Sequence, residues 1–250
     1  LFLVEQPKVN ATINASNKFF FIILMAVLMK TISYLKSNVL IITVTLALLA
    51  YFFWLMLKIV WQYIPYNLDV GFLRIKQQYL HIDLWRWAFF VHVYSSLFTL
   101  IAGFTQFSTK IISLSPRMHR TLGYLYVIFV LGLSGPSGLI ISFFSNGGWV
   151  AITGFLTLSV LWMYFTATAL IKAKQKKFDE HRRYMIRSYA LTLSAITLRA
   201  WKFAIANVFD LPPMDVYALI AWLGFGVNLL VAEWWIRRPV FKNNMLRGNR

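Results

Sequence analysis

Residues 120–171 read RTLGYLYVIFVLGLSGPSGLIISFFSNGGWVAITGFLTLSVLWMYFTATALI, two long apolar runs separated by the four residues SNGG. Each run supplies the roughly 20 apolar residues that a helix needs to cross a hydrocarbon core of about 30 Å. Asn-Gly and Gly-Gly are typical of tight turns, so the two runs are predicted to be antiparallel neighbours. The stretch therefore predicts a membrane protein built from helices.

Four further apolar runs extend this pattern along the chain. Hydrophobic residues make up 59% of the sequence. Charged residues make up 13%, about half of the roughly 25% usual in soluble domains. A chain with so little polar surface needs lipid as the solvent for much of it. We therefore predict an all-α, polytopic integral membrane protein, a six-helix bundle with spans at 39–62, 85–107, 120–144, 149–171, 184–206 and 216–235.

The predicted bundle forms one domain, residues 39–236, followed by a basic tail at 237–250. Residues 1–38 are expected to form a cytoplasmic N-terminal segment, whose apolar part, 19–29, is too short to span a bilayer. Two interpretations of that part stay open. It is either an interfacial helix, or translation begins at Met25 or Met29.

Basic residues gather in alternate loops of the predicted bundle. One side takes 17 of the 25 lysines and arginines, including the run at 172–183 and the tail. Because basic loops stay in the cytoplasm, both termini are predicted to be cytoplasmic. This face would attract anionic lipid head groups. It also accounts for the net charge of +17, so we expect no nucleic-acid partner.

Two histidines open predicted spans at the same face of the bundle. His119 starts the third span and His181 the fifth, and both spans run outward, so the two side chains are expected at one depth. If these helices flank one cavity, two neutral imidazoles are able to ligate one haem b iron axially. Arg120, Arg182 and Arg183 would then be the partners of the haem propionates. The alternative is that each His–Arg pair extends into the head-group layer without a ligand.

Residues at helical spacing give the fifth predicted span a largely polar face. They are His181, Ser188, Thr192, Ala195, Arg199 and Lys202. Together with His92 of the second span, Arg199 and Lys202 would form a polar site in the outer leaflet, suited to an anionic or quinone-like head group. The alternative is that Ser and Thr hydroxyls join helices, while Arg199 and Lys202 reach the outer interface.

Two residues bear on the shape and the charge balance of the bundle. Pro136 should kink the third span, because proline removes a helical hydrogen bond. Glu233 in the sixth span is expected to pair with Arg187 or Arg237.

Several chemistries have no support in the sequence. The chain has no cysteine, which excludes disulfides, iron–sulfur clusters and thiol catalysis. It has no glycine-rich phosphate loop, no HExxH and no GxSxG, the motifs of phosphoryl transfer, zinc proteolysis and serine hydrolysis. Whether the protein is an enzyme stays open.

Four stretches in this order carry a family resemblance: FFVHVYSSLFTLIAGFTQFS, RMHRTLGYLYV, DEHRRYMIRSYALTLSAITLRAW and AWLGFGVNLLVAEWW. Over about residues 80–236 the chain resembles a bacterial membrane-protein family catalogued as domain of unknown function 2306. The resemblance implies a multi-span protein of the bacterial inner (plasma) membrane without an assigned activity. It also implies that these residues occupy the recurring motif positions of the family: His92, His119, His181, Arg182, Arg187 and Arg199.

The helix start HRTLG, at 119–123, is also similar to helices of the dihaem cytochrome b and ferric reductase group. His92 has no partner histidine at its own depth, so the sequence departs from that dihaem pattern. Two functions remain as hypotheses. One is a b-type haem protein for membrane electron transfer, with quinone as a partner. The other is a non-catalytic subunit of a membrane complex, or a scaffold that interacts with lipid.

Overall fold

The computed structural model describes residues 39–106 and 115–238, which are helical and contain no β-strand. This confirms the predicted all-α class. The expected N-terminal segment, 1–38, and most of the basic tail lie outside the described residues. The α-helices are α2 (Val39–Trp61), α3 (Asp83–Gln106), α5 (Pro116–Ile128), α6 (Gly135–Ser142), α7 (Gly148–Lys174), α8 (Phe178–Thr192), α9 (Ser194–Val208) and α10 (Pro213–Arg237).

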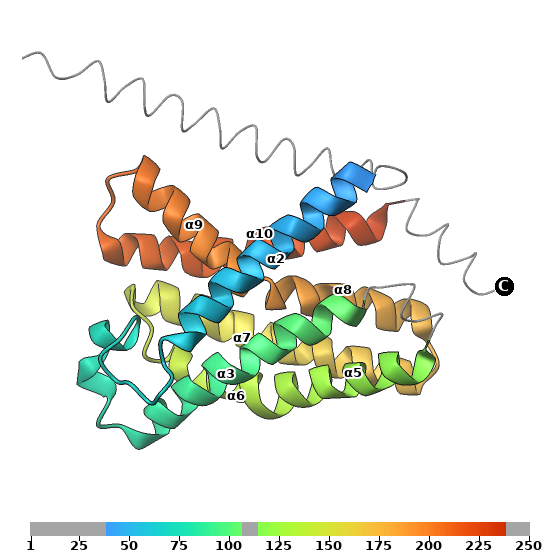
Figure 1. The fold of residues 1–250 in the computed structure, drawn as a ribbon, viewed down its shortest axis with the longest axis horizontal. Helices are drawn as coiled ribbons and strands as arrows, with labels where there is room; N and C mark the ends of the chain where they lie inside the picture. The colour runs from blue at the N-terminus through green and yellow to red at the C-terminus, as the bar shows by residue number, and fades with distance from the viewer. Residues whose placement is uncertain (1–38, 107–114, 239–250) are drawn as a thin grey trace, which may run out of the picture.

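The chain runs back and forth between two ends of a helical bundle (Figure 1). At one end lie the close of α3, the start of α5, the α7–α8 connection and the end of α10. We call it the basic end, because its exposed residues include Arg117, Lys174 and Arg237. At the opposite end lie residues 62–82, the α6–α7 turn and the α9–α10 connection. The loops that the sequence assigns to one side of a membrane thus share one end of the bundle.

Three helical stretches are long and apolar enough to cross a membrane: Pro116–Ser142, Gly148–Lys174 and Pro213–Arg237. They correspond to the third, fourth and sixth predicted spans. Polar residues such as Arg86 and His92 lower the hydropathy of α3. The fifth predicted span is divided between α8 and α9, each of 15 residues. The structure thus supports an integral membrane protein, with three clear candidate spans among the described residues.

The third candidate span is distorted directly before Pro136. Residues Phe129–Ser134 form a π-helical turn, η3, and the backbone N–H of Gly135 donates to the carbonyl of Val130, five residues earlier. Proline lacks an N–H and its ring crowds the preceding turn, so the normal helical pattern cannot continue through this position. The distortion lies where the sequence predicts a kink.

The fifth predicted span bends at Leu193, and α9 leaves the direction of α8 (Figure 1). The predicted polar face is therefore not one continuous surface. Ser188 and Thr192 lie in the bundle interior, whereas the side chain of Lys202 contacts Tyr217 of α10. The expectation of a single polar stripe was wrong, because equal spacing keeps residues on one face only in a straight helix.

A buried hydrogen-bonded cluster joins α5, α7 and α8. The Tyr126 hydroxyl lies 2.8 Å from both the Ser188 Oγ and the Thr192 Oγ1. From α7, the Trp162 Nε1 donates to the Thr192 Oγ1 at 3.0 Å, and the Thr166 Oγ1 lies 2.7 Å from the Ser188 Oγ. Buried polar groups are costly unless paired, so this cluster fixes how the three helices meet.

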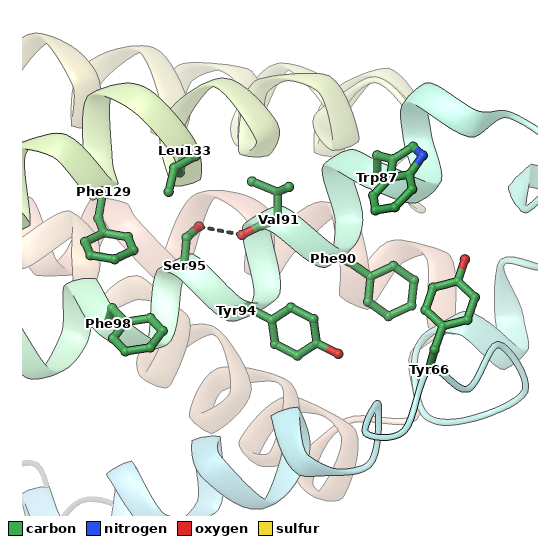
Figure 2. Close-up of a pocket in the computed structure, with 9 residues that line it drawn as sticks. All are labelled: Tyr66, Trp87, Phe90, Val91, Tyr94, Ser95, Phe98, Phe129 and Leu133. Carbon is green, nitrogen blue, oxygen red and sulfur yellow. Dashed lines mark hydrogen bonds between the residues drawn. The ribbon is translucent and has the colours of Figure 1, made fainter.

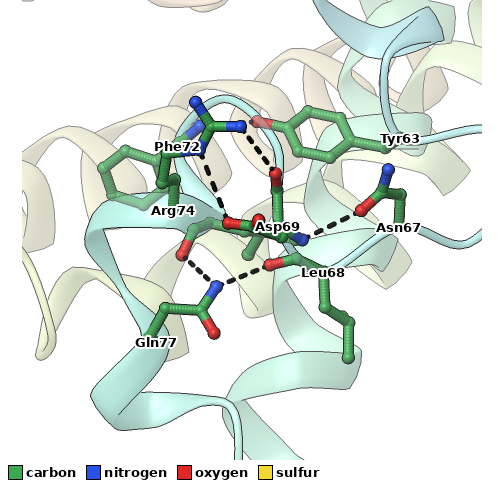
Figure 3. Close-up of polar contacts among 8 residues, drawn as sticks. Tyr63, Asn67, Leu68, Asp69, Phe72, Arg74 and Gln77 are labelled. Carbon is green, nitrogen blue, oxygen red and sulfur yellow. Dashed lines mark hydrogen bonds and ion pairs between the residues drawn. The ribbon is translucent and has the colours of Figure 1, made fainter.

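Residues 62–82 cap the opposite end of the bundle and hold a network of polar contacts (Figure 3). Arg74 pairs with Asp69, and the Gln77 amide donates to the Leu68 and Leu73 carbonyls. The sequence places Lys76 in this loop as one of its charges. The structure instead buries Lys76, with 1% of its surface exposed.

Candidate functional site

His119 lies in the first turn of α5, at the basic end. The helix starts at Pro116, whose missing N–H costs nothing in a first helical turn. The Ser115 Oγ caps the helix by accepting from the Met118 N–H at 3.3 Å. His119 is half-buried, and its Nδ1 is buried without a hydrogen-bond partner.

His181 lies in the first turn of α8 and is held by α7. Its Nδ1 lies 2.8 Å from the carbonyl oxygen of Ala169, a partner that an imidazole N–H would donate to. That bond leaves Nε2 as the ring nitrogen available to a ligand. The start of α8 is fixed beside α7 by an ion pair between Lys172 and Glu180, with Nζ and Oε2 2.6 Å apart.

The Tyr126–Ser188 contact sets the register between the two helices that carry these histidines. His119 precedes Tyr126 by seven residues, and His181 precedes Ser188 by seven residues. Seven residues are close to two helical turns, about 10.5 Å, so each histidine lies on the same face as its hydroxyl partner. The two imidazoles are accordingly close enough to interact electrostatically. The structure thus places the two histidines at the same end of the bundle, each seven residues before the Tyr126–Ser188 contact.

Two further buried polar atoms without a partner lie on the elements around these histidines. They are the Gln106 Nε2 at the end of α3 and the Arg183 Nε on α8. Gln106 packs against α5 at Gly123, where a Cβ would come within 3.1 Å of the Gln106 Oε1. Buried donors without an acceptor in the protein are rare, and ordered water or a bound group ordinarily completes them.

The three predicted propionate partners differ in position. Arg183 is half-buried beside the site, whereas Arg120 and Arg182 are exposed. The Arg120 Nε donates to the carbonyl of Pro116 in its own helix, at 3.4 Å. Arg183 is therefore the member of this set that lies closest to the interior.

The orientation of the His181 ring suits a ligand to a metal. A ligating histidine ordinarily donates its second ring nitrogen to a carbonyl or carboxylate, as the His181 Nδ1 is placed to do. The described residues contain no group of three or more His, Asp or Glu side chains suited to a metal ion. A metal ion at this end of the bundle would therefore need His119, His181 and the porphyrin ring of a haem as its ligands.

The predicted outer-leaflet site is brought together only in part. The His92 Nδ1 on α3 lies 2.9 Å from the Ser134 carbonyl oxygen, and the ring packs against Gly138, where a Cβ would come within 3.0 Å. Arg199 of α9 is exposed, and its Nη1 donates to the carbonyl of Ala195 in its own helix at 2.5 Å. The Lys202 side chain contacts α10, with its Nζ 3.2 Å from the Tyr217 hydroxyl and 4.8 Å from the centre of the Tyr217 ring. Lys202 therefore belongs to the α9–α10 interface.

The acidic residue of α10 is paired within the bundle. Glu233 forms a two-point ion pair with Arg187 of α8, in which the Arg187 Nη2 donates to the Glu233 Oε2 at 3.1 Å. Arg237 approaches the same carboxylate at 3.8 Å. Both expected partners are thus in place, and Arg187 is the closer of the two.

Sequence reasoning missed a groove of about 410 Å³ along the outer surface of α3 (Figure 2). Its lining is mainly aromatic, and residues 87, 90, 94 and 98 of α3 recur at helical spacing, which is the signal that could have revealed it. The lining residues are Tyr66, Trp87, Phe90, Val91, Tyr94, Ser95, Phe98, Phe129 and Leu133.

Comparison with known families matches residues 89–236 to the model described as "Predicted membrane protein (DUF2306)". The chain belongs to this family. The DUF2306 region runs from α3 to the end of α10 and includes His92, His119, His181 and Arg199, but not α2 or the cap at 62–82. The resemblance read from the sequence is thereby confirmed, whereas the likeness to the dihaem cytochrome b group finds no support here. No curated protein and no solved structure matches the chain.

Proposed function

We propose that this DUF2306 protein is a haem b protein of the bacterial inner membrane that carries electrons, with quinone as a partner. It has six spans and cytoplasmic termini. To the three clear candidate spans, α2, α3 and the bent α8–α9 pair would add three more. The concentration of basic residues at one end of the bundle supports the orientation, because such residues stay on the cytoplasmic side.

The observation that carries the haem proposal is the register of α5 and α8. Both histidines lie in the first turns of their helices, seven residues before the Tyr126–Ser188 contact, at the basic end. His181 would ligate through Nε2, while Ala169 holds the ring orientation from the other nitrogen. Arg183 would neutralise a propionate. When bound, haem supplies reversible one-electron chemistry, and the surrounding aliphatic and aromatic side chains would exclude water from it.

The test is an absorption spectrum of protein purified from haem-replete cells. A Soret band that shifts on dithionite reduction is expected in the wild type. His119→Ala and His181→Ala should each lose most of the haem, because one remaining axial ligand holds the iron poorly. His81→Ala is the matched control, since His81 is exposed at the opposite end and should keep full haem content.

His92→Ala should also retain the haem, because His92 is tied to Ser134 on the other half of the bundle. Size-exclusion profiles of every variant separate haem loss from misfolding. Colourless wild-type protein, or equal haem content in wild type and His181→Ala, would refute the proposal.

A second function is favoured by a different observation. The contacts between α5, α7 and α8 include a buried hydrogen-bonded set, Tyr126 with Ser188 and Thr192, and such sets hold helices together. A rigid bundle with an aromatic outer groove would suit a non-catalytic subunit of a membrane complex, or a scaffold that interacts with lipid. Colourless, well-folded protein that co-purifies with other membrane proteins is the outcome expected for this function.

A further inference from the structure

The groove along α3 is a slot that is closed at its inner end. On α3 its lining runs from Trp87 to Phe98, eleven residues or about 16 Å at 1.5 Å per residue. The stacked rings of Phe98 and Phe129, with centres 5.2 Å apart, close the inner end. At the other end Tyr66 of the cap lies against Phe90, with ring centres 4.8 Å apart (Figure 2). Half of a hydrocarbon core of about 30 Å is about 15 Å, so the groove is as deep as one leaflet.

The two hydroxyl groups inside the groove are bonded to the bundle. The Ser95 Oγ donates to the Val91 carbonyl at 2.5 Å and accepts from the Ser134 Oγ at 2.7 Å. The Tyr94 hydroxyl donates to the Tyr63 carbonyl at 3.2 Å. The surface that remains for a ligand is aliphatic and aromatic. Such a surface suits a hydrocarbon chain and disfavours a charged group, which would lose its hydration without gaining a partner.

The mouth of the groove carries polar atoms. Trp87 and Tyr66 lie there, with 65% and 59% of their surfaces exposed. Figure 2 shows the indole nitrogen and the phenol oxygen of these two side chains at the cap end of the groove. Trp and Tyr gather at the level of lipid head groups, because their polar atoms reach water while their rings stay in hydrocarbon. The groove is thus polar at the head-group level and apolar below it, as an amphiphilic ligand requires.

The groove is too narrow for a helix of another protein. A volume of about 410 Å³ over a length of about 16 Å gives a mean cross-section of about 25 Å². A helix about 10 Å across has a cross-section of roughly 80 Å². A single extended hydrocarbon chain is slender enough to fit. The exposed apolar residues Leu84 and Ile101 precede and follow the lining on α3, so the groove is continuous with the apolar outer surface of the bundle.

We propose that this groove binds one acyl chain of a phospholipid from the leaflet at the cap end. The chain lies along α3, with its methyl end at Phe98 and Phe129. Its ester group lies at the mouth, where Trp87 and Tyr66 donate hydrogen bonds to the ester carbonyl. The site does not depend on the haem proposed at the basic end, which is the opposite end of the bundle.

Trp87 itself reports the occupant, because bromine quenches tryptophan fluorescence only at short range. Protein in dodecyl maltoside receives a small amount of phosphatidylcholine, brominated either near the ester or near the methyl end of its chains. This lipid has no net charge, so the basic residues do not attract it. The Trp87 signal is the difference between the wild type and Trp87→Phe. Trp149, which is 80% exposed at the same end of the bundle but outside the groove, is the matched control through Trp149→Phe.

We expect quenching of Trp87 at lipid concentrations that leave Trp149 unchanged, and stronger quenching by bromine near the ester than near the methyl end. Val91→Phe narrows the groove and should remove most of this quenching. Val160→Phe, the same change at an exposed position of α7, should behave as the wild type. Should Val91→Phe not fold, Leu133→Phe narrows the groove from its other wall, and the wild-type dependence on bromine position still decides.

Equal quenching of Trp87 and Trp149, or equal quenching of Trp87 in the wild type and Val91→Phe, overturns the proposal. Two further results would assign the groove to another occupant and overturn it as well. One is quenching that an isoprenoid quinone displaces and unbrominated phosphatidylcholine does not. The other is a dimer of this chain that Val91→Phe dissociates in size-exclusion chromatography.

Discussion

The hydroxyl group of Tyr126 on α5 contacts side chains of both α7 and α8. Tyr126→Phe keeps the ring but leaves the Ser188 and Thr192 hydroxyls and the Trp162 N–H without this partner in a buried region. An unsatisfied buried polar group costs about 1–3 kcal/mol, so we expect the free energy of unfolding to fall by about 2 kcal/mol. Denaturant unfolding in detergent measures it. Tyr124→Phe, an exposed position on the same helix, should change nothing measurable.

Lys76 predicts a stability that depends on pH. Its Nζ donates to the Phe144 carbonyl and to the Asn146 side chain, and desolvation by burial lowers the pKa of Lys76 from 10.5 to about 8. Between these values the unfolded chain binds a proton that the folded protein has released. The free energy of unfolding should therefore rise from pH 8 to pH 10.5, by about 3 kcal/mol.

The measurement is the thermal midpoint of the wild type and of Lys76→Met across this pH range. Only the wild type should gain from the titration of Lys76, so the difference between the two proteins isolates it. Identical pH profiles would contradict the expected shift in the pKa of Lys76.

Neither of these residues could be assigned from the sequence. Tyr126 is one of 12 tyrosines, and its hydroxyl partners lie 62 and 66 residues away. Lys76 stands in a polar loop, where lysine is ordinarily solvated. Burial here results from the aromatic rings of Phe72 and Tyr79, which lie beneath the charge at 5.7 and 5.0 Å.

At the scale of helices, Gly103 allows α3 and α8 to approach closely. A Cβ at this position would lie 2.0 Å from the Tyr189 ring, which is itself buried with 8% of its surface exposed. We expect Gly103→Ala to lower the free energy of unfolding by about 2 kcal/mol, because the buried ring has little room to move. Gly226→Ala on α10 meets nothing within 4 Å and should be neutral or slightly stabilising.

The helices themselves were largely predictable, because long apolar runs and the SNGG turn leave few alternatives. The distortion at Pro136 was predictable from the missing N–H of proline. The bend at Leu193 was not, since leucine is a good helix former and nothing local marks the position. It follows from packing: α8 lies against α7, whereas α9 lies against α10.

The residues of the candidate sites were likewise predictable from the sequence only in part. His119 and His181 were predicted to lie at one depth from their places in the sequence, and both do lie in the first turns of helices that start at the basic end. Arg199 and Lys202 were grouped by spacing along one helix. Both lie on α9, but the Arg199 Nη1 donates to Ala195 in its own helix, whereas the Lys202 Nζ contacts Tyr217 of α10.

The arrangement of the whole molecule predicts which positions face the outside of the cell. The chain has no cysteine, so single substitutions report their own accessibility. In intact cells, a membrane-impermeant maleimide should label Asp69→Cys, an exposed position in the cap at 62–82. It should label Lys174→Cys, an exposed position at the basic end, only after permeabilisation. The reverse pattern would invert the proposed topology.

The burial of Lys76 also has a consequence for biosynthesis. The ribosome makes its two oxygen partners, on Phe144 and Asn146, 68 and 70 residues after Lys76 itself. The nascent chain must therefore keep this lysine hydrated until the α6–α7 hairpin has emerged, because an unpaired buried ammonium is too costly to form early. Closure of the cap at 62–82 is thus a late event in assembly, because it requires the α6–α7 turn to be in place.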